Sequence, residues 1–296
     1  MKIKTRRYYI YYFSRILFFL LRFIPLKVSL VIADALGRMA FNFLDKYREI
    51  AVSNLDEVFS KDHEQNVRIA KGVFSNLAKS GAEWIKIPSL NKKNIDDLVT
   101  EIEGIDRLEE ALARGKGVII MASHFGNWEL LLSCLTLKGY TGVVIAKRLY
   151  FYKYDEFISD MRNKTGVRIL YRDESPKKAL KVLKEGGMLG VLADQDVDSV
   201  EGVFVDFFGK QAYTPVGPVK LGLVTGASIV PSFMIRKGDN TFKLVLEEPI
   251  VLSRGENTED DIKRYTQEWT DVLEKYVRQY PEQWVWLHQR WKTKKS

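Results

Sequence analysis

The chain has little cysteine, little histidine and no long uncharged hydrophobic run. Its 296 residues include one cysteine, Cys134, which excludes an internal disulfide framework and favours a reducing compartment. Cys134 lies in an apolar helical pattern, so we interpret it as a packing residue rather than a nucleophile. Three histidines are the whole supply of imidazole for acid–base chemistry or metal binding.

Several common site motifs are absent as well. Neither Gly186-Gly187 nor Thr225-Gly226-Ala227 has the G-x-x-x-x-G-K-S/T spacing of a phosphate-binding loop, and there is no G-x-G-x-x-G. The G-x-S-x-G turn is missing too, which argues against a serine hydrolase. Lysine and arginine number 46 against 38 aspartates and glutamates, a net charge of +8. That excess favours anionic partners: a membrane surface, an acidic carrier protein, a phosphorylated substrate or nucleic acid.

The longest apolar stretch, Tyr8–Ile24, is at the short limit for crossing a bilayer. It follows a basic cluster and is interrupted by Arg15 and Arg22, which are seven residues apart and share one helix face. We predict a membrane-associated helix over residues 1–25, with its basic end on the cytoplasmic side. The sequence leaves open whether this helix spans the bilayer or lies in its interface. Residues 26–296 would form the catalytic domain.

From residue 117 onward, short β-branched runs alternate with helical patterns. This rhythm predicts an α/β fold in which a mainly parallel, mixed sheet is flanked by helices. We expect strands at 117–122, 142–146, 167–171, 188–193, 228–235 and 241–246. We expect helices between and after them at 127–137, 151–164, 176–185 and 261–280.

A histidine and a carboxylate follow the first of these strands, in the stretch Ala122-Ser123-His124-Phe125-Gly126-Asn127-Trp128-Glu129. In open α/β sheets, ligands bind at the carboxyl ends of strands. A neutral His124 can take a proton from an alcohol, and Glu129 can orient the ring and stabilise its cation. On one continuous helix the two side chains would point about 140° apart, so they converge only if His124 lies on the turn before the helix. The spacing alone leaves a purely structural alternative open, in which Glu129 is a solvated helix-start carboxylate.

Two other predicted strand ends carry charged side chains. Arg148 follows the strand at 142–146 and Arg162 lies in the next helix, where guanidinium groups would suit phosphate groups. Asp194 and Asp196 follow the strand at 188–193. At this spacing the two carboxylates could hold a divalent metal and a nucleotide-sugar, or they could shape the site without a metal.

The stretch around His124 resembles the motif of the bacterial lipid A biosynthesis acyltransferases, the late lauroyl and myristoyl transferases. These enzymes belong to the wider glycerolipid acyltransferase group that is marked by H-x4-D/E. The resemblance covers residues 48–293, and in the tail it gives His288 a structural role. Its other elements are Asp194-Gln195-Asp196, a strand at Val203-Phe204-Val205, Phe207-Phe208-Gly209, a turn at Thr214-Pro215-Val216-Gly217 and the tail Pro281–Thr293.

The resemblance implies that a fatty acyl chain moves from acyl carrier protein, or acyl-CoA, to a hydroxyl of a membrane glycolipid such as a lipid A precursor. The enzyme would work at the cytoplasmic face of the inner membrane, without a cofactor, a metal or an acyl-enzyme. His124 would be the general base and Glu129 its partner, while Asn127 or the helix N-terminus would stabilise the oxyanion. The implied substrate-binding residues are Asn127, Arg148, Arg162, Asp194 and Asp196.

Two rival functions remain from the residues themselves. One is a membrane-associated, metal-dependent glycosyltransferase that uses Asp194 and Asp196. The other is a non-enzymatic basic protein that binds membranes or nucleic acid, which would leave the H-x4-E turn unexplained. The resemblance favours acyl transfer, with no nucleic-acid partner. It does not choose the acceptor, because some family members acylate other glycolipids such as phosphatidylinositol mannosides.

Overall fold

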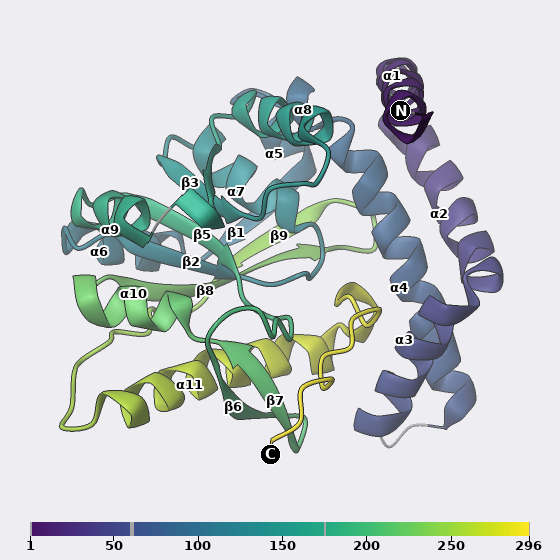
Figure 1. Cartoon of the computed structure of the whole chain (residues 1–296). Helices are drawn as coiled ribbons and strands as arrows, with labels where there is room; N and C mark the ends of the chain where they lie inside the picture. The colour runs from purple at the N-terminus through teal and green to yellow at the C-terminus, as the bar shows by residue number, and fades with distance from the viewer. Residues whose placement is uncertain (1, 60–61, 175, 296) are drawn as a thin grey trace.

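The computed structural model describes residues 2–59, 62–174 and 176–295. At its centre is a seven-stranded sheet in the order β1-β9-β8-β2-β5-β3-β4 (Figure 1). Five neighbouring pairs are parallel and the β8–β9 pair is antiparallel, so the predicted α/β fold with a mainly parallel, mixed sheet is confirmed. The strands are β1 (Val99–Glu103), β2 (Val118–Ala122), β3 (Gly142–Ala146), β4 (Arg168–Tyr171), β5 (Met188–Leu192), β8 (Ser228–Arg236) and β9 (Phe242–Leu246).

Helices cover both faces of the sheet, so its central strands β2, β5 and β8 are almost wholly buried. All five residues of β2 are buried, and they alternate between the two hydrophobic clusters of the core. Strands covered on both sides read as continuous hydrophobic runs, which is why β2 was recognisable in the sequence. On one face lie α6 (Ile105–Ala113) and α7 (Trp128–Leu137); on the other lie α9 (Pro176–Lys184), α10 (Gly217–Thr225) and α11 (Thr258–Gln279).

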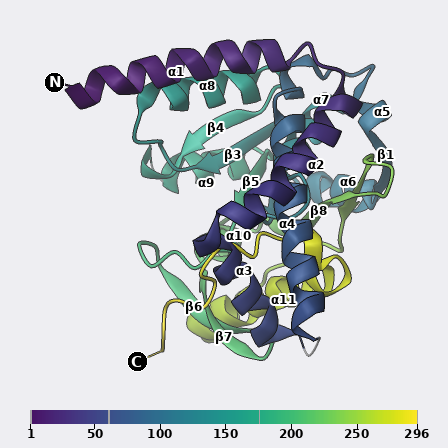
Figure 2. The same cartoon turned by 90° about the vertical axis from the view of Figure 1, so that its right-hand side faces the viewer.

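Four helices of at least 14 residues come before the sheet in the described part of the chain. Figure 2 shows α1 lying along α8 (Tyr152–Asn163) and α2 crossing in front of α4. In the part of the chain that the structure describes, no helix is both long and apolar enough to cross a bilayer. The four helices are α1 (Lys2–Leu21), α2 (Leu26–Phe43), α3 (Asp45–Val58) and α4 (His63–Trp84).

Three elements were not predicted from the sequence. The edge strand β1 has just one fully buried side chain, Val99, so its pattern is weak and its pairing with β9 fixes it. The second is β7 (Lys210–Pro215), which pairs antiparallel with β6 (Gly202–Phe207), the strand that contains the expected Val203-Phe204-Val205. This pair is separate from the main sheet and packs on α11. The third element is α10, which carries Gly217, Pro218 and Gly222, residues that lower helix propensity. Smaller elements are α5 (Ile95–Leu98) and the 3₁₀ turns η1 (Ile87–Ser89), η2 (Arg172–Glu174) and η3 (Pro281–Gln283).

The close packing of α2 on α4 yields a stability prediction. A Cβ added at Gly37 of α2 would lie 2.6 Å from the carbonyl oxygen of Phe74, which is backbone and cannot move aside. We expect Gly37→Ala to lower the free energy of unfolding by about 1–3 kcal/mol. In α4, a Cβ added at Gly81 meets no atom within 4 Å, so Gly81→Ala is the matched control and should raise stability by about 0.5–1 kcal/mol. Chemical denaturation of both variants checks this; a neutral Gly37→Ala would contradict the close approach.

Candidate active site

The centre of the site is the turn at residues 123–127. β2 ends at Ala122 and α7 begins at Trp128, so His124 lies on the turn before the helix, as convergence with other side chains requires. Gly126 has a φ of +56° and its Cα faces the Met234 carbonyl oxygen, where any Cβ would collide. Asn127 is the N-cap of α7, because its side-chain oxygen accepts a hydrogen bond of 3.1 Å from the Leu130 amide.

The carboxylate that holds the His124 ring is that of Asp194. Nδ1 of His124 lies 2.8 Å from Oδ1 of Asp194, and the His124 backbone N–H donates to Oδ2 over 2.9 Å. The indole of Trp284 donates to the same Oδ2 over 3.0 Å. Because Asp194 accepts at Nδ1, the imidazole exposes Nε2, the nitrogen that can take a proton from a substrate. Asp194 therefore has the geometry of a partner that fixes the tautomer of a general base.

Glu129 is bound to Arg162 instead. The guanidinium of Arg162 on α8 makes a two-pronged contact with the carboxylate, Nε to Oε2 at 2.9 Å and NH2 to Oε1 at 2.5 Å. Both side chains are largely buried, with about one fifth of each exposed. The structure thus brings two of the predicted site residues, Glu129 and Arg162, together as a pair beside His124. The orienting contact that the sequence suggested between Glu129 and His124 is occupied by Asp194.

Gln195 links the His124 ring to the tail of the chain. Its Nε2 lies 3.1 Å from Nδ1 and 3.2 Å from Nε2 of His124, and 2.6 Å from Nε2 of His288. If Gln195 Nε2 lay in the plane of the His124 ring at these two distances, it would collide with a ring carbon such as Cε1. The Gln195 amide therefore lies over the face of the imidazole. That position leaves the in-plane lone pair of His124 Nε2 clear.

Charges around His124 set its protonation. Burial lowers the pKa of His124, but the Asp194 carboxylate outweighs it, with a smaller contribution from Glu129, so the net pKa is raised. Burial alone would raise the pKa of Asp194. The charge of His124, together with the hydrogen bonds that Asp194 accepts from the His124 ring, the His124 backbone and Trp284, holds this pKa at about 2. His288 is different: burial and the charge of His124 lower its pKa to about 4, so it is neutral near pH 7. His124 is therefore the imidazole of the pair that can cycle a proton.

Two predicted binding residues have structural partners. Asp196 accepts from the backbone N–H and the hydroxyl of Thr293, at 2.8 and 2.7 Å, and so fastens the tail. Arg148 contacts Asp173 at 3.2 Å and lies over the Tyr171 ring at 3.7 Å, at the β3–β4 edge of the sheet. Across the described residues, no group of three histidine, cysteine, aspartate or glutamate side chains is placed to hold a metal ion.

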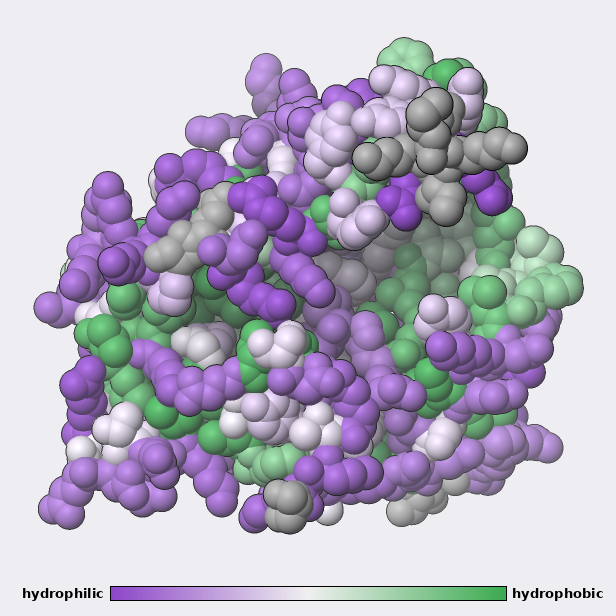
Figure 3. Space-filling model, viewed as in Figure 1, coloured by the Kyte–Doolittle hydropathy of each residue, from purple (hydrophilic) through white to green (hydrophobic). Residues whose placement is uncertain are grey.

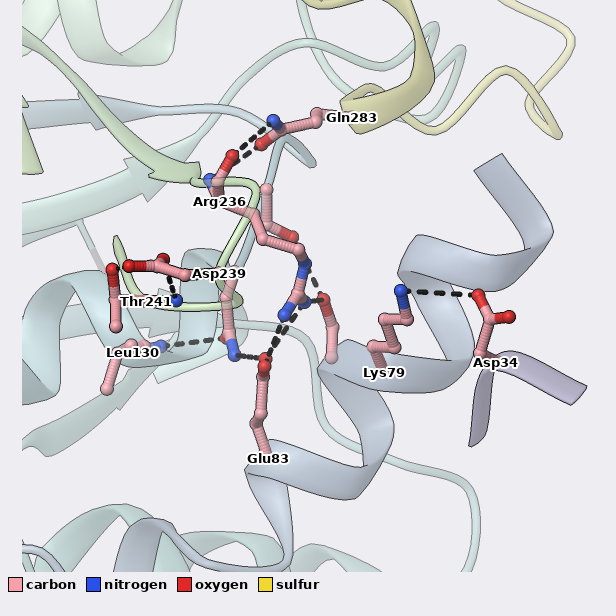
Figure 4. A network of polar contacts seen from close by, with 11 residues as sticks. Asp34, Lys79, Glu83, Leu130, Arg236, Asp239, Thr241 and Gln283 are labelled. Carbon is pink, nitrogen blue, oxygen red and sulfur yellow. Dashed lines mark hydrogen bonds and ion pairs between the residues drawn. The ribbon is translucent and has the colours of Figure 1, made fainter. Parts of the chain in front are cut away.

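A buried ion pair supports the turn from below (Figure 4). Glu83 of α4 accepts from the two terminal guanidinium nitrogens of Arg236 of β8, and also from the Asn127 side-chain amide at 2.7 Å. Burial raises the pKa of Glu83, which the hydrogen bonds from Arg236 and Asn127 oppose. On the other side of Arg236, its backbone exchanges hydrogen bonds with the Gln283 side chain. The same network also fixes Gly126, whose amide donates to the Gln283 carbonyl at 2.8 Å.

A small apolar pocket of about 40 Å³ lies beside the Glu129–Arg162 pair. Its walls come from α7 and the adjoining strands β2, β3 and β5, and include Gly190. Such a pocket can receive an apolar group next to a charged one. The other lining side chains that matter here are Trp128, Leu131, Leu132 and Val144.

Sequence reasoning missed Trp284 and Gln195 as site residues. Trp284 forms an isolated bridge with Phe125, and the Val285 amide donates to the His124 carbonyl at 3.0 Å. Both residues lie inside stretches that carried the family resemblance, but neither has a titratable group to draw attention. His288 was expected to be structural, and its ring lies 5.4 Å from that of His124.

Comparison with known proteins gives a consistent result. The family model described as "Bacterial lipid A biosynthesis acyltransferase" matches residues 1–293. A phosphatidylinositol mannoside acyltransferase of Mycobacterium tuberculosis is 29% identical over 73% of this chain and 69% of its own length. A lipid A biosynthesis acyltransferase of Haemophilus influenzae is 26% identical over 94% and 86%. The lipid A biosynthesis lauroyltransferase of Escherichia coli is 25% identical over 92% and 87%.

The Glu83–Arg236 pair yields a second stability prediction. Arg236→Met would leave the buried Glu83 without its cation, so we expect the free energy of unfolding to fall by about 3–5 kcal/mol. Adding Glu83→Gln to that variant removes the uncompensated charge and should restore part of the loss. Denaturant unfolding of the single and double variants measures both steps. A single variant that loses less than about 1 kcal/mol would show that the pair is not needed to hold the turn.

Proposed function

We propose that this chain, which belongs to the bacterial lipid A biosynthesis acyltransferase family and is an acyltransferase, moves a fatty acyl chain from acyl carrier protein to a hydroxyl of a membrane glycolipid. The observation that carries the mechanism is His124, a histidine at a strand end with its Nδ1 bound to a buried carboxylate. The reaction would take place at the cytoplasmic face of the inner membrane, where an acyl donor in solution meets a lipid acceptor.

In the proposed mechanism His124 is the general base. Its Nε2 takes the proton of the acceptor hydroxyl while the hydroxyl oxygen attacks the thioester carbonyl carbon. The tetrahedral intermediate then collapses, the carbon–sulfur bond breaks, and the imidazolium returns the proton to the leaving thiolate. Asp194 holds the ring through Nδ1 and stabilises its cation. Transfer is direct, with no acyl-enzyme.

We assign the remaining roles from contacts and charge. The Asn127 side chain caps α7 with its oxygen and donates an N–H to Glu83, so the N-terminus of α7 is the better candidate to stabilise the oxyanion. Arg162, held in place by Glu129, is suited to a phosphate of the donor or of the acceptor head group. Part of the acyl chain would enter the apolar pocket beside Trp128.

The acceptor we favour is a lipid A precursor, with a phosphatidylinositol mannoside as the second candidate. Both types of acceptor occur in the names of the similar proteins. Mass spectrometry of lipids from a strain that lacks the gene would identify the missing acyl chain and its position. The glycosyltransferase alternative has lost its main support, because Asp194 and Asp196 accept hydrogen bonds from His124, Trp284 and Thr293.

The first functional prediction concerns His124. His124→Ala is expected to lower kcat by roughly 100- to 10,000-fold, because the acceptor hydroxyl loses its base. The measurement is transfer of a labelled acyl chain from acyl carrier protein to a purified glycolipid. His63→Ala is the matched control and should leave turnover unchanged, since the exposed His63 ring at the start of α4 contacts Asp56 of α3. Near-normal turnover of a folded His124→Ala protein would refute the mechanism.

The second functional prediction separates the two carboxylates near His124. The ring is a base only when unprotonated, so kcat/KM falls as the pH drops through its pKa, which Asp194 raises. Asp194→Asn should therefore move the acid limb of the kcat/KM–pH profile, the range in which activity falls, to lower pH. It should also lower kcat by roughly 100- to 10,000-fold. Glu129→Gln removes a charge that Arg162 already balances, so it should move the limb in the same direction by less. If Glu129→Gln has the larger effect on both quantities, Glu129 and not Asp194 is the partner of His124.

A further inference from the structure

The exposed apolar side chains of this protein are concentrated on α1 and α2. Among the described residues, 17 of the 22 exposed large hydrophobic side chains lie between Tyr9 and Tyr47. Monomeric proteins rarely leave so extended an apolar surface in contact with water, and such surfaces mark a binding partner. We call this set of side chains the α1–α2 face.

One side of α1 is fixed to the catalytic domain. Tyr11 packs against Tyr154 of α8 with ring centroids 5.3 Å apart, and Phe18 packs against Phe157 at 4.9 Å. At the end of α1, the Lys86 ammonium donates to carbonyl oxygens of the last turn and of the residues that follow it. The helix is thus held along the surface of the domain, and its opposite side remains exposed.

α2 is fixed in the same way to α4. Its buried residues are Leu30, Ala33, Gly37 and Phe41, spaced three or four apart as one helix stripe. Between residues 28 and 43 the charged side chains are Asp34 and Arg38, which pair with each other at 2.8 Å. The outer side of α2 is therefore almost free of charge.

Both outer sides belong to one side of the molecule. Figure 2 shows α1 along the upper edge of this side and α2 running down across it, at an angle to α1. In Figure 3 hydrophobic residues line a hollow below the N-terminal end of the chain and beside α2. The catalytic turn is only one helix away from α2, because Ser80 of α4 donates to the Gly126 carbonyl over 3.1 Å.

We propose that the α1–α2 face lies in the boundary between head groups and acyl chains of an anionic bilayer, with α2 inserted as well as α1. Two helices in one plane bind a bilayer from one side without crossing it. The observations that select a bilayer over a second copy of the chain are the net charge of +8, the tyrosines among the exposed residues and the arginines along the same helices. The proposal rests on the proposed function only in that a glycolipid acceptor has to be reached from this surface.

The experiment measures binding of the full chain to vesicles by flotation. Wild-type protein should float with vesicles that contain phosphatidylglycerol and less with pure phosphatidylcholine. Val31→Glu combined with Met39→Glu, on the outer side of α2, should lower the partition coefficient by at least about tenfold. Phe13→Glu combined with Ile16→Glu should do the same for α1. The matched control is Val224→Glu combined with Val251→Glu, two exposed apolar residues outside the face, which should bind like wild type.

The depth of each helix can be read with a fluorescent label. Cys134 is buried and burial raises the pKa of its thiol to about 12, so an added cysteine reacts alone. Labels on Phe13→Cys and Leu36→Cys should both be quenched more by nitroxides near the head groups than by nitroxides at the bilayer centre. A label on Val251→Cys should be quenched by neither.

Several results would overturn the proposal. Full binding by the folded α2 variant would remove α2 from the surface, and strong quenching at the bilayer centre would mean that α1 crosses. A dimer that the α2 variant dissociates, with no vesicle binding by wild type, would make the face a protein interface. Turnover on acceptor dissolved in detergent separates this test from the proposed function, because the α2 variant should retain it even when vesicle binding is lost.

Discussion

A single buried carboxylate connects the parts of this protein that have to meet. Asp194 accepts hydrogen bonds from the backbone and the ring of His124 and from the indole of Trp284. Asp194 follows the end of β5, His124 lies on the turn after β2, and Trp284 belongs to the tail of the chain. An unpaired carboxylate at this depth would be costly, so its donors have to be present together. The need to satisfy one charge thereby fixes the orientation of the His124 ring.

Buried charged groups on the α4 side of the turn likewise fix a residue of the turn. The Glu83–Arg236 pair satisfies two opposite charges and in doing so fixes Asn127, the residue that caps α7. A turn held from both the tail and α4 cannot relax without exposing a buried charge to an apolar surrounding. The proposed role of His124 as a general base calls for such a preorganised ring, because reorganisation at the moment of reaction would cost rate. The rigidity of the site and the stability of the core therefore share residues.

The sequence predicted the fold well where burial dictates pattern. β2 and its neighbours are apolar on both sides, so their positions could be read from hydrophobic runs, whereas β1 owes its existence to pairing with β9. At the site, the location of His124 followed from its place at a strand end. Its partner could not, because Asp194 and Glu129 are both carboxylates in the same crevice. Which of them reaches Nδ1 depends on where Arg162 lies, a contact across 33 residues that spacing does not encode.

The tail contacts also bear on how the enzyme comes into being. Trp284 and Val285 lie against a turn that was synthesised about 160 residues earlier, and Gln195 meets His288 across 93 residues. During translation these tail residues leave the ribosome after every other part of the site. The His124 ring can therefore reach its final position only once the residues up to His288 have emerged. A polypeptide that stops before Trp284 would leave Asp194 and His124 without their contacts to the tail, so the geometry of the site depends on a segment that is synthesised after the whole sheet.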